Sequence, residues 1–208
     1  MPKEGRSVLA AAALLAILTV SAPAFAQVDL QILPSATTVA QGATVDVPVI
    51  VSGLGDHASP GVRTFDLVME FDPTHFAYTG LTVGSSLGNA LAAPPESIVS
   101  TTAGASELDV LQVSLLAPAD LVALQPESLT LFTAHFRALE LGDGAFGLTL
   151  NADLGDEFAD PIPLGRNQGA SVHVANAVEL PTASESGLFV LATALLALGL
   201  WFLPRKAS

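Results

Sequence analysis

Four carboxylates lie within eight residues late in the sequence, where hard oxygen ligands could hold a calcium ion. They are Asp153, Asp156, Glu157 and Asp160. However, the Asp-x-Asn/Asp-x-Asp-Gly order of a calcium-binding loop is absent, and no glutamate follows at the distance that bidentate coordination requires. The pattern therefore favours a solvated acidic loop and no cofactor, with calcium as the one ion that the sequence leaves open.

Other patterns that occur at catalytic sites have little support. The segment Gly84-Ser85-Ser86-Leu87-Gly88 matches the Gly-x-Ser-x-Gly string of a nucleophile elbow, but that motif needs a strand-to-helix turn in a parallel sheet, which nothing around it predicts. Cysteine is absent, which removes thiolate nucleophiles and thiolate zinc sites. The histidines form no metal-binding pair and are interpreted as solvated surface residues: His57, His75, His135 and His173. We predict no catalytic residue and no enzyme activity.

The charge of the sequence limits the classes of partner. The 208 residues carry a net charge of −13. Between Gln27 and Val174 there is no lysine, and only Arg63, Arg137 and Arg166 offset the many acids. Such a field repels phosphate, so we predict no nucleic-acid partner, and anionic lipid headgroups are disfavoured as partners. A partner that meets this surface should be basic or bridged by cations.

The N-terminal segment, residues 1–26, has the pattern of a secretory signal peptide. A basic start is followed by an apolar run from Val8 to Val20, and the segment ends in small residues at Ala24 and Ala26. Cleavage is expected between Ala26 and Gln27. The alternative, an uncleaved helical anchor, is less favoured because the apolar run is short. The sequence predicts an exported protein.

The C-terminal segment predicts attachment to a membrane. After a linker and motif at residues 175–187, an uncharged run from Leu188 to Leu203 is followed by Arg205 and Lys206. About 1.5 Å per residue makes this run slightly short of a hydrocarbon core, but it can span with its flanking residues. We therefore predict a transmembrane helix with a basic tip at 188–208, with the basic residues on the cytoplasmic side and the main domain outside.

The motif before this helix resembles a C-terminal sorting signal. Leu180, Pro181, Thr182, Ser184 and Glu185 are similar in register to the IPTL variant of the PEP-CTERM signals, which exosortase-type transpeptidases process. The resemblance implies anchoring in the inner membrane of a Gram-negative bacterium, followed by transfer to the cell surface or extracellular matrix. The alternative is a plain tail anchor that is never cut.

The middle of the sequence alternates apolar and polar residues with a period of two, which is typical of β-strands. Examples are Val45 to Val51, Phe65 to Phe71, and Phe132 to Ala138. A fourth example has Leu111, Val113 and Leu115 inward, with Gln112 and Ser114 outward. Short strands separated by Gly and Pro turns predict an all-β, antiparallel jelly-roll sandwich. Pro48 predicts an edge strand or a bulge, and Ser85 to Ser106 a long irregular loop.

Residues 27–174 also resemble the cohesin family. The segment from Gly61 to Tyr78 has its Gly-x-x-x-Phe strand leading into Phe-Asp-Pro, and Leu129 to Ala138 and Asn151 to Ile162 are similar to its later strand and acidic turn. The resemblance implies a jelly roll of about nine strands. It also implies a non-catalytic module that binds dockerins in a polysaccharide-related context.

Recognition is expected on a sheet face, by a dockerin-like or other surface protein. The alternative is a carbohydrate-binding or matrix-adhesion module that uses the loop at 85–106, with polysaccharide as the partner. Stacking on sugars has weak support because Tyr78 is the one Tyr and the module contains no Trp. The residues predicted to form the binding face are Asp66, Glu70, Gln112, Thr133, His135 and Arg137.

Overall fold

The computed structural model describes residues 27–149 and 153–176. The signal peptide, the sorting motif and the C-terminal membrane helix were predicted outside these residues. Within the described ranges, no helix has the length and apolar character needed to cross a membrane.

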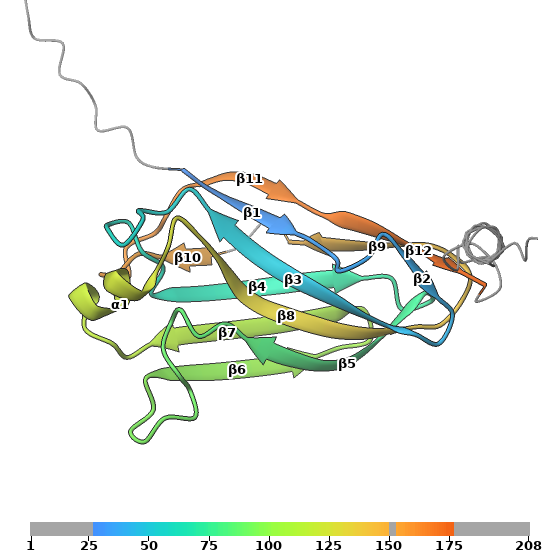
Figure 1. Cartoon of the computed structure of the whole chain (residues 1–208), viewed down its shortest axis with the longest axis horizontal. Helices are drawn as coiled ribbons and strands as arrows, with labels where there is room; N and C mark the ends of the chain where they lie inside the picture. The colour runs from blue at the N-terminus through green and yellow to red at the C-terminus, as the bar shows by residue number, and fades with distance from the viewer. Residues whose placement is uncertain (1–26, 150–152, 177–208) are drawn as a thin grey trace, which may run out of the picture.

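The described residues form strands joined by turns, together with a single short helix (Figure 1). The elements are β1 (Val28–Ile32), β2 (Thr38–Ala40), β3 (Thr44–Ser52), β4 (Thr64–Phe71), β5 (Phe76–Val83), β6 (Ser97–Ala103), β7 (Glu107–Ser114), α1 (Pro118–Leu124), β8 (Ser128–Ala138), β9 (Gly142–Leu148), β10 (Asp153–Gly155), β11 (Leu164–Gln168) and β12 (Ala170–Ala175).

The strands build two sheets that face each other. The five-stranded sheet has the order β11-β1-β3-β8-β5, and the seven-stranded sheet has the order β2-β12-β9-β4-β7-β6, with β10 paired to β4. Most neighbours are antiparallel, but β1 pairs with β11 and β2 pairs with β12 in parallel. The last two strands join different sheets, since β11 extends the five-stranded sheet and β12 pairs within the seven-stranded sheet. The predicted all-β sandwich is confirmed.

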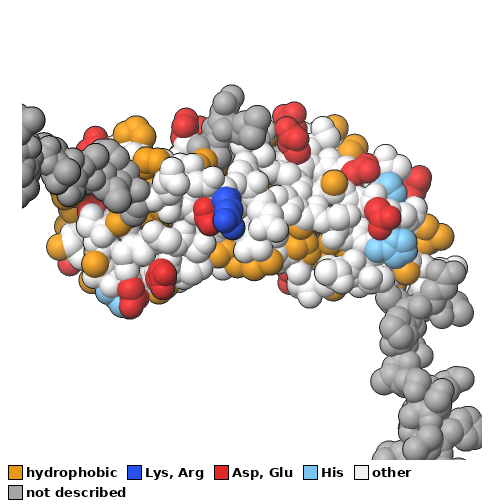
Figure 2. All heavy atoms as spheres, turned by 90° about the horizontal axis from the view of Figure 1, so that it is seen from above, with side chains coloured by type: hydrophobic (Ala, Val, Ile, Leu, Met, Phe, Trp, Pro, Cys, Tyr) orange, Lys and Arg blue, Asp and Glu red, His pale blue; other side chains and the backbone are white. Residues whose placement is uncertain are grey.

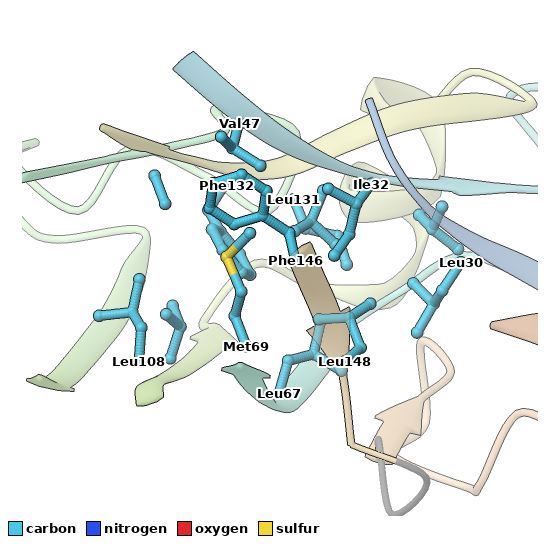
Figure 3. Close-up of a cluster of buried hydrophobic side chains, with 14 of the residues drawn as sticks. Leu30, Ile32, Val47, Leu67, Met69, Leu108, Leu131, Phe132, Phe146 and Leu148 are labelled. Carbon is cyan, nitrogen blue, oxygen red and sulfur yellow. The ribbon is translucent and has the colours of Figure 1, made fainter. Parts of the chain in front are cut away.

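The core lies between the sheets and explains why these segments are strands. Along β3 and β4, alternate side chains are buried, so each strand places one apolar face inward and one polar face outward. The predicted inward phases of β3, β4 and β8 are confirmed. Figure 3 shows part of this core, contributed by both sheets: Leu30, Ile32, Val47, Leu67, Met69, Leu108, Leu131, Phe132, Phe146 and Leu148.

The inward phase of β7 differs from the prediction. Leu108 and Val110 are fully buried, and the same face continues through Gln112 and Ser114, which are also fully buried. Leu111 therefore points outward. Gln112 Nε2 donates to Ser97 Oγ at 3.1 Å, which gives the buried amide one partner. The prediction of Gln112 as a surface contact is wrong, because the register that Leu108 and Val110 require turns it into the sandwich.

Two further local predictions are corrected or refined. The predicted loop at 85–106 contains β6, whose β-branched residues pair with β7 along its whole length. Pro48 lies in β3, a central strand, so it does not mark an edge. A register shift follows between Val49 and Ile50, which confirms the expected bulge nearby. Pro48 lies opposite Leu33, just past the end of β1, and its C=O still accepts from the Leu33 N–H at 3.0 Å, so the proline removes only the reciprocal bond of this last pair.

One end of the sandwich is closed by α1 and by buried polar side chains. Gln125, which follows the helix, is fully buried. Its Oε1 accepts from Val62 N–H and its Nε2 donates to Val62 O, each at 2.6 Å, so the amide replaces a missing strand neighbour. No pattern in the sequence predicted this helix. Pro118 at its first turn provides a fixed φ and needs no hydrogen-bond donor there.

Glu157 is buried at the same end and is held as a carboxylate. It is 3% exposed, and Oε2 accepts from the N–H of Gly61 at 3.0 Å. Burial opposes ionisation, but hydrogen bonds from the Ser59 hydroxyl and the Gly61 N–H outweigh it and lower the pKa of Glu157. Arg63 Nη1 donates to the backbone oxygen of Glu157 at 3.0 Å. These bonds fix the turn before β4 against the turn after β10.

Replacing Glu157 with glutamine should lower the free energy of unfolding by about 1–3 kcal/mol at neutral pH, because charge-assisted bonds to buried donors are lost. Since the folded pKa lies below the unfolded one, this contribution is present above the unfolded pKa and disappears as the pH falls through the folded pKa. Denaturant titrations of wild type and Glu157→Gln at several pH values should therefore converge in acid. Glu140→Gln, a substitution of an exposed carboxylate, is the control. A constant difference across the pH range would contradict the ionised state.

Candidate functional site

The residues predicted to form one binding face are not brought together. Asp66 and Glu70 are exposed on β4, on the outer face of the seven-stranded sheet. Thr133, His135 and Arg137 lie on the outer face of β8, in the five-stranded sheet, on the opposite side of the sandwich. The sequence shows which side chains point outward, but it does not show which strands share a sheet.

The outer face of the seven-stranded sheet is the more distinctive surface. Its carboxylates come from three adjacent strands, β10, β4 and β7, and lie beside the half-buried apolar side chains of Val68 and Leu111, with Val113 next to Leu111 on the outer face of β7. Ile98 on β6, next to Val113, adds a large apolar side chain that is 55% exposed. We call this surface the acidic face. Its carboxylates are Asp66, Glu70, Glu107, Asp109 and Asp153.

The register of these strands places like charges directly opposite each other. Glu70 pairs with Glu107 across β4 and β7, and Asp66 pairs with Asp153 across β4 and β10. Asp109 is also close enough to act on Asp66. Burial, and then the charge of Asp109 and a hydrogen bond to it, raise the pKa of Asp66, with a smaller contribution from Asp153. Opposed like charges destabilise a sheet, so this arrangement opposes folding.

No arginine of the described chain compensates these charges. Arg137 and Arg166 belong to β8 and β11 of the five-stranded sheet, and Arg63 donates to the backbone of Glu157. In Figure 2, which views the molecule from above the orientation of Figure 1, acidic side chains are spread over the visible surface, whereas basic ones occur at one place. The acidic face is thus suited to receive cationic groups.

A small depression on the acidic face has the lining that a cationic side chain needs. It has a volume of about 110 Å³ and is polar. Two carboxylates and two hydroxyls converge there, beside one apolar side chain. The lining residues are Asp66, Ser100, Thr102, Asp109 and Leu111.

Removing one of two opposed charges should stabilise the fold. Glu107→Gln is expected to raise the free energy of unfolding by about 0.2–1 kcal/mol at low ionic strength, because it relieves the repulsion from Glu70. The gain should shrink in high salt, which screens exposed charges. Urea denaturation at two salt concentrations measures this, with Glu127→Gln, an exposed residue outside the acidic face, as the control. A loss of stability would show that Glu107 makes a favourable contact instead.

The histidines are paired with aspartates and are not simply solvated. Asp72 accepts from His75 Nδ1 at 2.9 Å, and Asp143 accepts from His173 Nδ1 at 2.8 Å. The hydrogen bond with His75, followed by one from the Thr74 N–H, lowers the pKa of Asp72. His57 lies 3.7 Å from the carboxylate of its neighbour in the chain. The interpretation of these residues as solvated missed this pairing: His173 and Asp143 meet only because β12 pairs with β9, whereas His75 and Asp72 are three residues apart in the chain and could have been considered together.

His135 forms a longer chain of hydrogen bonds on the five-stranded sheet. Its Nδ1 lies 2.7 Å from Asp46 Oδ1 and its Nε2 lies 2.9 Å from Thr82 Oγ1. The order carboxylate, imidazole, hydroxyl matches that of a catalytic triad. Here the bonds join β3, β8 and β5 across the outer face, so they hold these three strands in register. Thr133, the next outward-facing residue along β8, lies directly opposite Thr82 on β5.

The acidic cluster at 153–160 and the Gly-x-Ser-x-Gly string do not form sites in the structure. Asp156 Oδ1 accepts from the backbone N–H groups of Phe158 and Asp160, whereas Glu157 points into the protein. Over the described ranges, no three acidic or histidine side chains converge in a way that could hold a metal ion. The Gly-x-Ser-x-Gly string forms turns after β5, and Gln125 Nε2 donates to Ser86 O at 3.2 Å. It does not lie on a strand-to-helix turn.

Two antiparallel layers closed by parallel pairing of β1 with β11 define a jelly-roll architecture. No protein-family model matches the sequence, and no curated protein matches it.

Solved structures with a similar fold are cohesin domains. The sixth cohesin of scaffoldin B from Acetivibrio cellulolyticus, in complex with Cel5 dockerin, is 18% identical with a TM-score of 0.56, covering 72% of this chain and 99% of that one. A type II cohesin from the same organism is 14% identical with a TM-score of 0.58, over 70% and 95% of the two chains. A cohesin module of a Clostridium perfringens family 33 glycoside hydrolase is 14% identical with a TM-score of 0.56, over 73% and 98%. The fold is cohesin-like.

Proposed function

We propose that this protein is a non-catalytic, exported binding module, and that its acidic face binds a dockerin-type or other surface protein in a polysaccharide-related context. The observation that carries the proposal is the set of opposed like charges on the acidic face. A sheet face with no binding role gains nothing from placing Glu70 against Glu107, whereas a cationic partner turns that repulsion into attraction.

The composition of the acidic face supports a protein partner. Val68 and Leu111 lie beside carboxylates, and Val113 with Ile98 extends the apolar part beyond them, so this surface combines apolar and charged groups as protein interfaces do. The cohesin-like fold adds support, because several similar structures contain cohesins in complex with dockerins. The expected partner presents basic side chains around an apolar contact.

The cellular context of the proposal comes from the two ends of the sequence. The signal peptide pattern at 1–26 and the sorting motif with its apolar run support export followed by attachment at the envelope. N-terminal sequencing of the mature protein should begin at Gln27, and membrane fractionation should show whether the C-terminal segment is retained. A mature N-terminus at Met1 would contradict export by signal cleavage.

Affinity capture with the full chain tests the binding function. The secreted fraction and cell-wall polysaccharide of the source organism are offered separately, with and without a calcium chelator. The wild type should retain a discrete protein, and Asp66→Asn combined with Asp109→Asn should lose it. The matched control, Glu127→Gln with Glu140→Gln, removes two exposed charges outside the acidic face and should retain the partner. Retention on polysaccharide with no captured protein would overturn the proposal in favour of an adhesion module.

A further inference from the structure

An apolar hollow lies between the last strands of the two sheets. It has a volume of about 620 Å³, which is in the range of ligand sites. β5 ends the five-stranded sheet, β6 ends the seven-stranded sheet, and the loop that joins them lines one part of the hollow (Figure 1). The residues that these two strands contribute are Tyr78, Leu81, Thr82, Val83, Val99 and Thr101.

The backbone of β6 presents hydrogen-bonding groups at this hollow. Leu115 N–H donates to Glu96 O, and Gly104 N–H donates to Glu107 O, so the even-numbered residues at this edge bond to β7. Because donors and acceptors alternate along an antiparallel strand, the N–H and C=O groups of Val99 and Thr101 point away from β7. Within the described residues β6 has no other neighbouring strand. The same two residues line the hollow.

The edge of β6 lacks the features that usually protect such strands. Ser97–Ala103 contains no charged residue and no proline, and it pairs with β7 without a register shift. By contrast, β5 has a register shift between Tyr78 and Gly80. Edge strands normally carry charges, prolines or bulges that prevent pairing with other chains. A regular, uncharged edge beside an apolar hollow is a template for an added strand.

The absence of charge in the lining of the hollow indicates which kind of segment could pair with β6. None of the described residues that line the hollow is ionised, although the chain as a whole is strongly acidic. Burial raises the pKa of Tyr78, so its hydroxyl also stays neutral. A second copy of this chain fits poorly, because pairing two β6 edges would bring two acidic faces together, with Glu107 and Asp109 only one strand from the contact.

We propose that the free edge of β6 binds an extended, uncharged segment of another protein as an additional strand, with alternate apolar side chains of that segment in the hollow. The site is separate from the acidic face and does not depend on the function proposed for it. Backbone pairing with Val99 and Thr101 supplies the directional contacts, and the apolar lining of the hollow selects side chains without charge.

Phage-displayed random heptapeptides selected on the full chain provide the probe. We expect enrichment of uncharged sequences with alternating apolar residues. Amide hydrogen exchange should then report the contact directly. A saturating synthetic peptide should slow exchange at Val99 and Thr101 at least about tenfold, while Ile98 and Ser100, which already bond to β7, change little.

Two matched pairs separate strand addition from ordinary apolar binding. Thr101→Pro removes an N–H that points away from β7, so it should keep the fold and abolish peptide binding, whereas Thr101→Val should bind like the wild type. In case Thr101→Pro disturbs folding, N-methylation of alternate peptide residues should abolish binding to the unchanged protein. The Asp66→Asn with Asp109→Asn variant should bind the peptide normally.

Three outcomes would overturn the proposal. These are the absence of enriched peptides, equal binding of the N-methylated peptide, and concentration-dependent protection of Val99 and Thr101 without any peptide. The last result would assign the β6 edge to a second copy of this chain.

Discussion

Phe136→Ala is expected to lower the free energy of unfolding by about 3–5 kcal/mol, a large share of the stability of a domain of this size. Phe136 is fully buried on β8, at the centre of the aromatic core. Its ring centroid lies 4.9 Å from that of Phe71, 5.0 Å from that of Phe146, 6.0 Å from that of Tyr78 and 6.4 Å from that of Phe76. These rings come from both sheets, so alanine would leave a cavity that neither sheet can close alone.

Chemical denaturation of wild type and variant measures this loss. Phe158→Ala is the matched control, because Phe158 is 69% exposed and its removal should change stability by less than about 0.5 kcal/mol. A loss below about 1 kcal/mol for Phe136→Ala would mean that the two layers rearrange around the site. Close packing in this region also requires Gly144, because a Cβ there would collide with the Phe76 ring.

The fold was predictable where a strand has one apolar face and one polar face. β4 shows this clearly, since Phe65, Leu67 and Met69 are buried and Asp66 and Glu70 are exposed, as expected. β7 was not predictable in the same way because both of its faces carry apolar residues. Alternation then fits two phases equally well, and only the packing of Leu108 and Val110 against the opposite sheet decides between them.

The site was less predictable because it depends on which strands are neighbours. Asp46 and His135 are 89 residues apart in sequence, and they meet because the β3–β8 register places them directly opposite. The same limit applies to Glu70 and Glu107, which are opposed only once β4 pairs with β7. The sequence revealed the excess of acids, whereas the sheet order determines that they collect on one face and that β8 lies on the other.

On the proposed function, the acidic face combines a cost in stability with a gain in recognition, and its titration can separate the two. Burial, and then the charge of Asp109, raise the pKa of Asp66 in the folded state, so its protonation removes a partly desolvated charge and relieves repulsion. By linkage, this group favours the folded state below its unfolded pKa, and that contribution is lost as the pH rises through the folded pKa. Mild acid should therefore weaken the binding of a basic partner, whereas the protonation of Asp66 itself should not destabilise the fold.

Reversing charge on the acidic face should abolish this recognition. Asp66→Lys combined with Asp109→Lys is expected to reduce the affinity for the partner captured by the wild type at least about 100-fold, since like charges across an interface cost several kcal/mol. Calorimetric titration measures the effect, and a circular dichroism spectrum like that of the wild type shows that the fold is retained. The wild-type affinity should fall with added salt and with acidification that begins above the range of an ordinary aspartate.

The control for this experiment places the same charges on the opposite side of the sandwich. Thr133→Lys with Thr44→Lys adds two bases to the outer face of the five-stranded sheet, where Arg137 already lies opposite Thr44. This variant should bind the partner like the wild type, because the two faces are separated by the core. The control changes the net charge by +2 and the Asp66→Lys, Asp109→Lys variant by +4, so a loss of binding free energy in the control about half as large would show that the affinity reflects net charge alone. Unchanged affinity in the Asp66→Lys, Asp109→Lys variant would remove the acidic face from the binding mechanism.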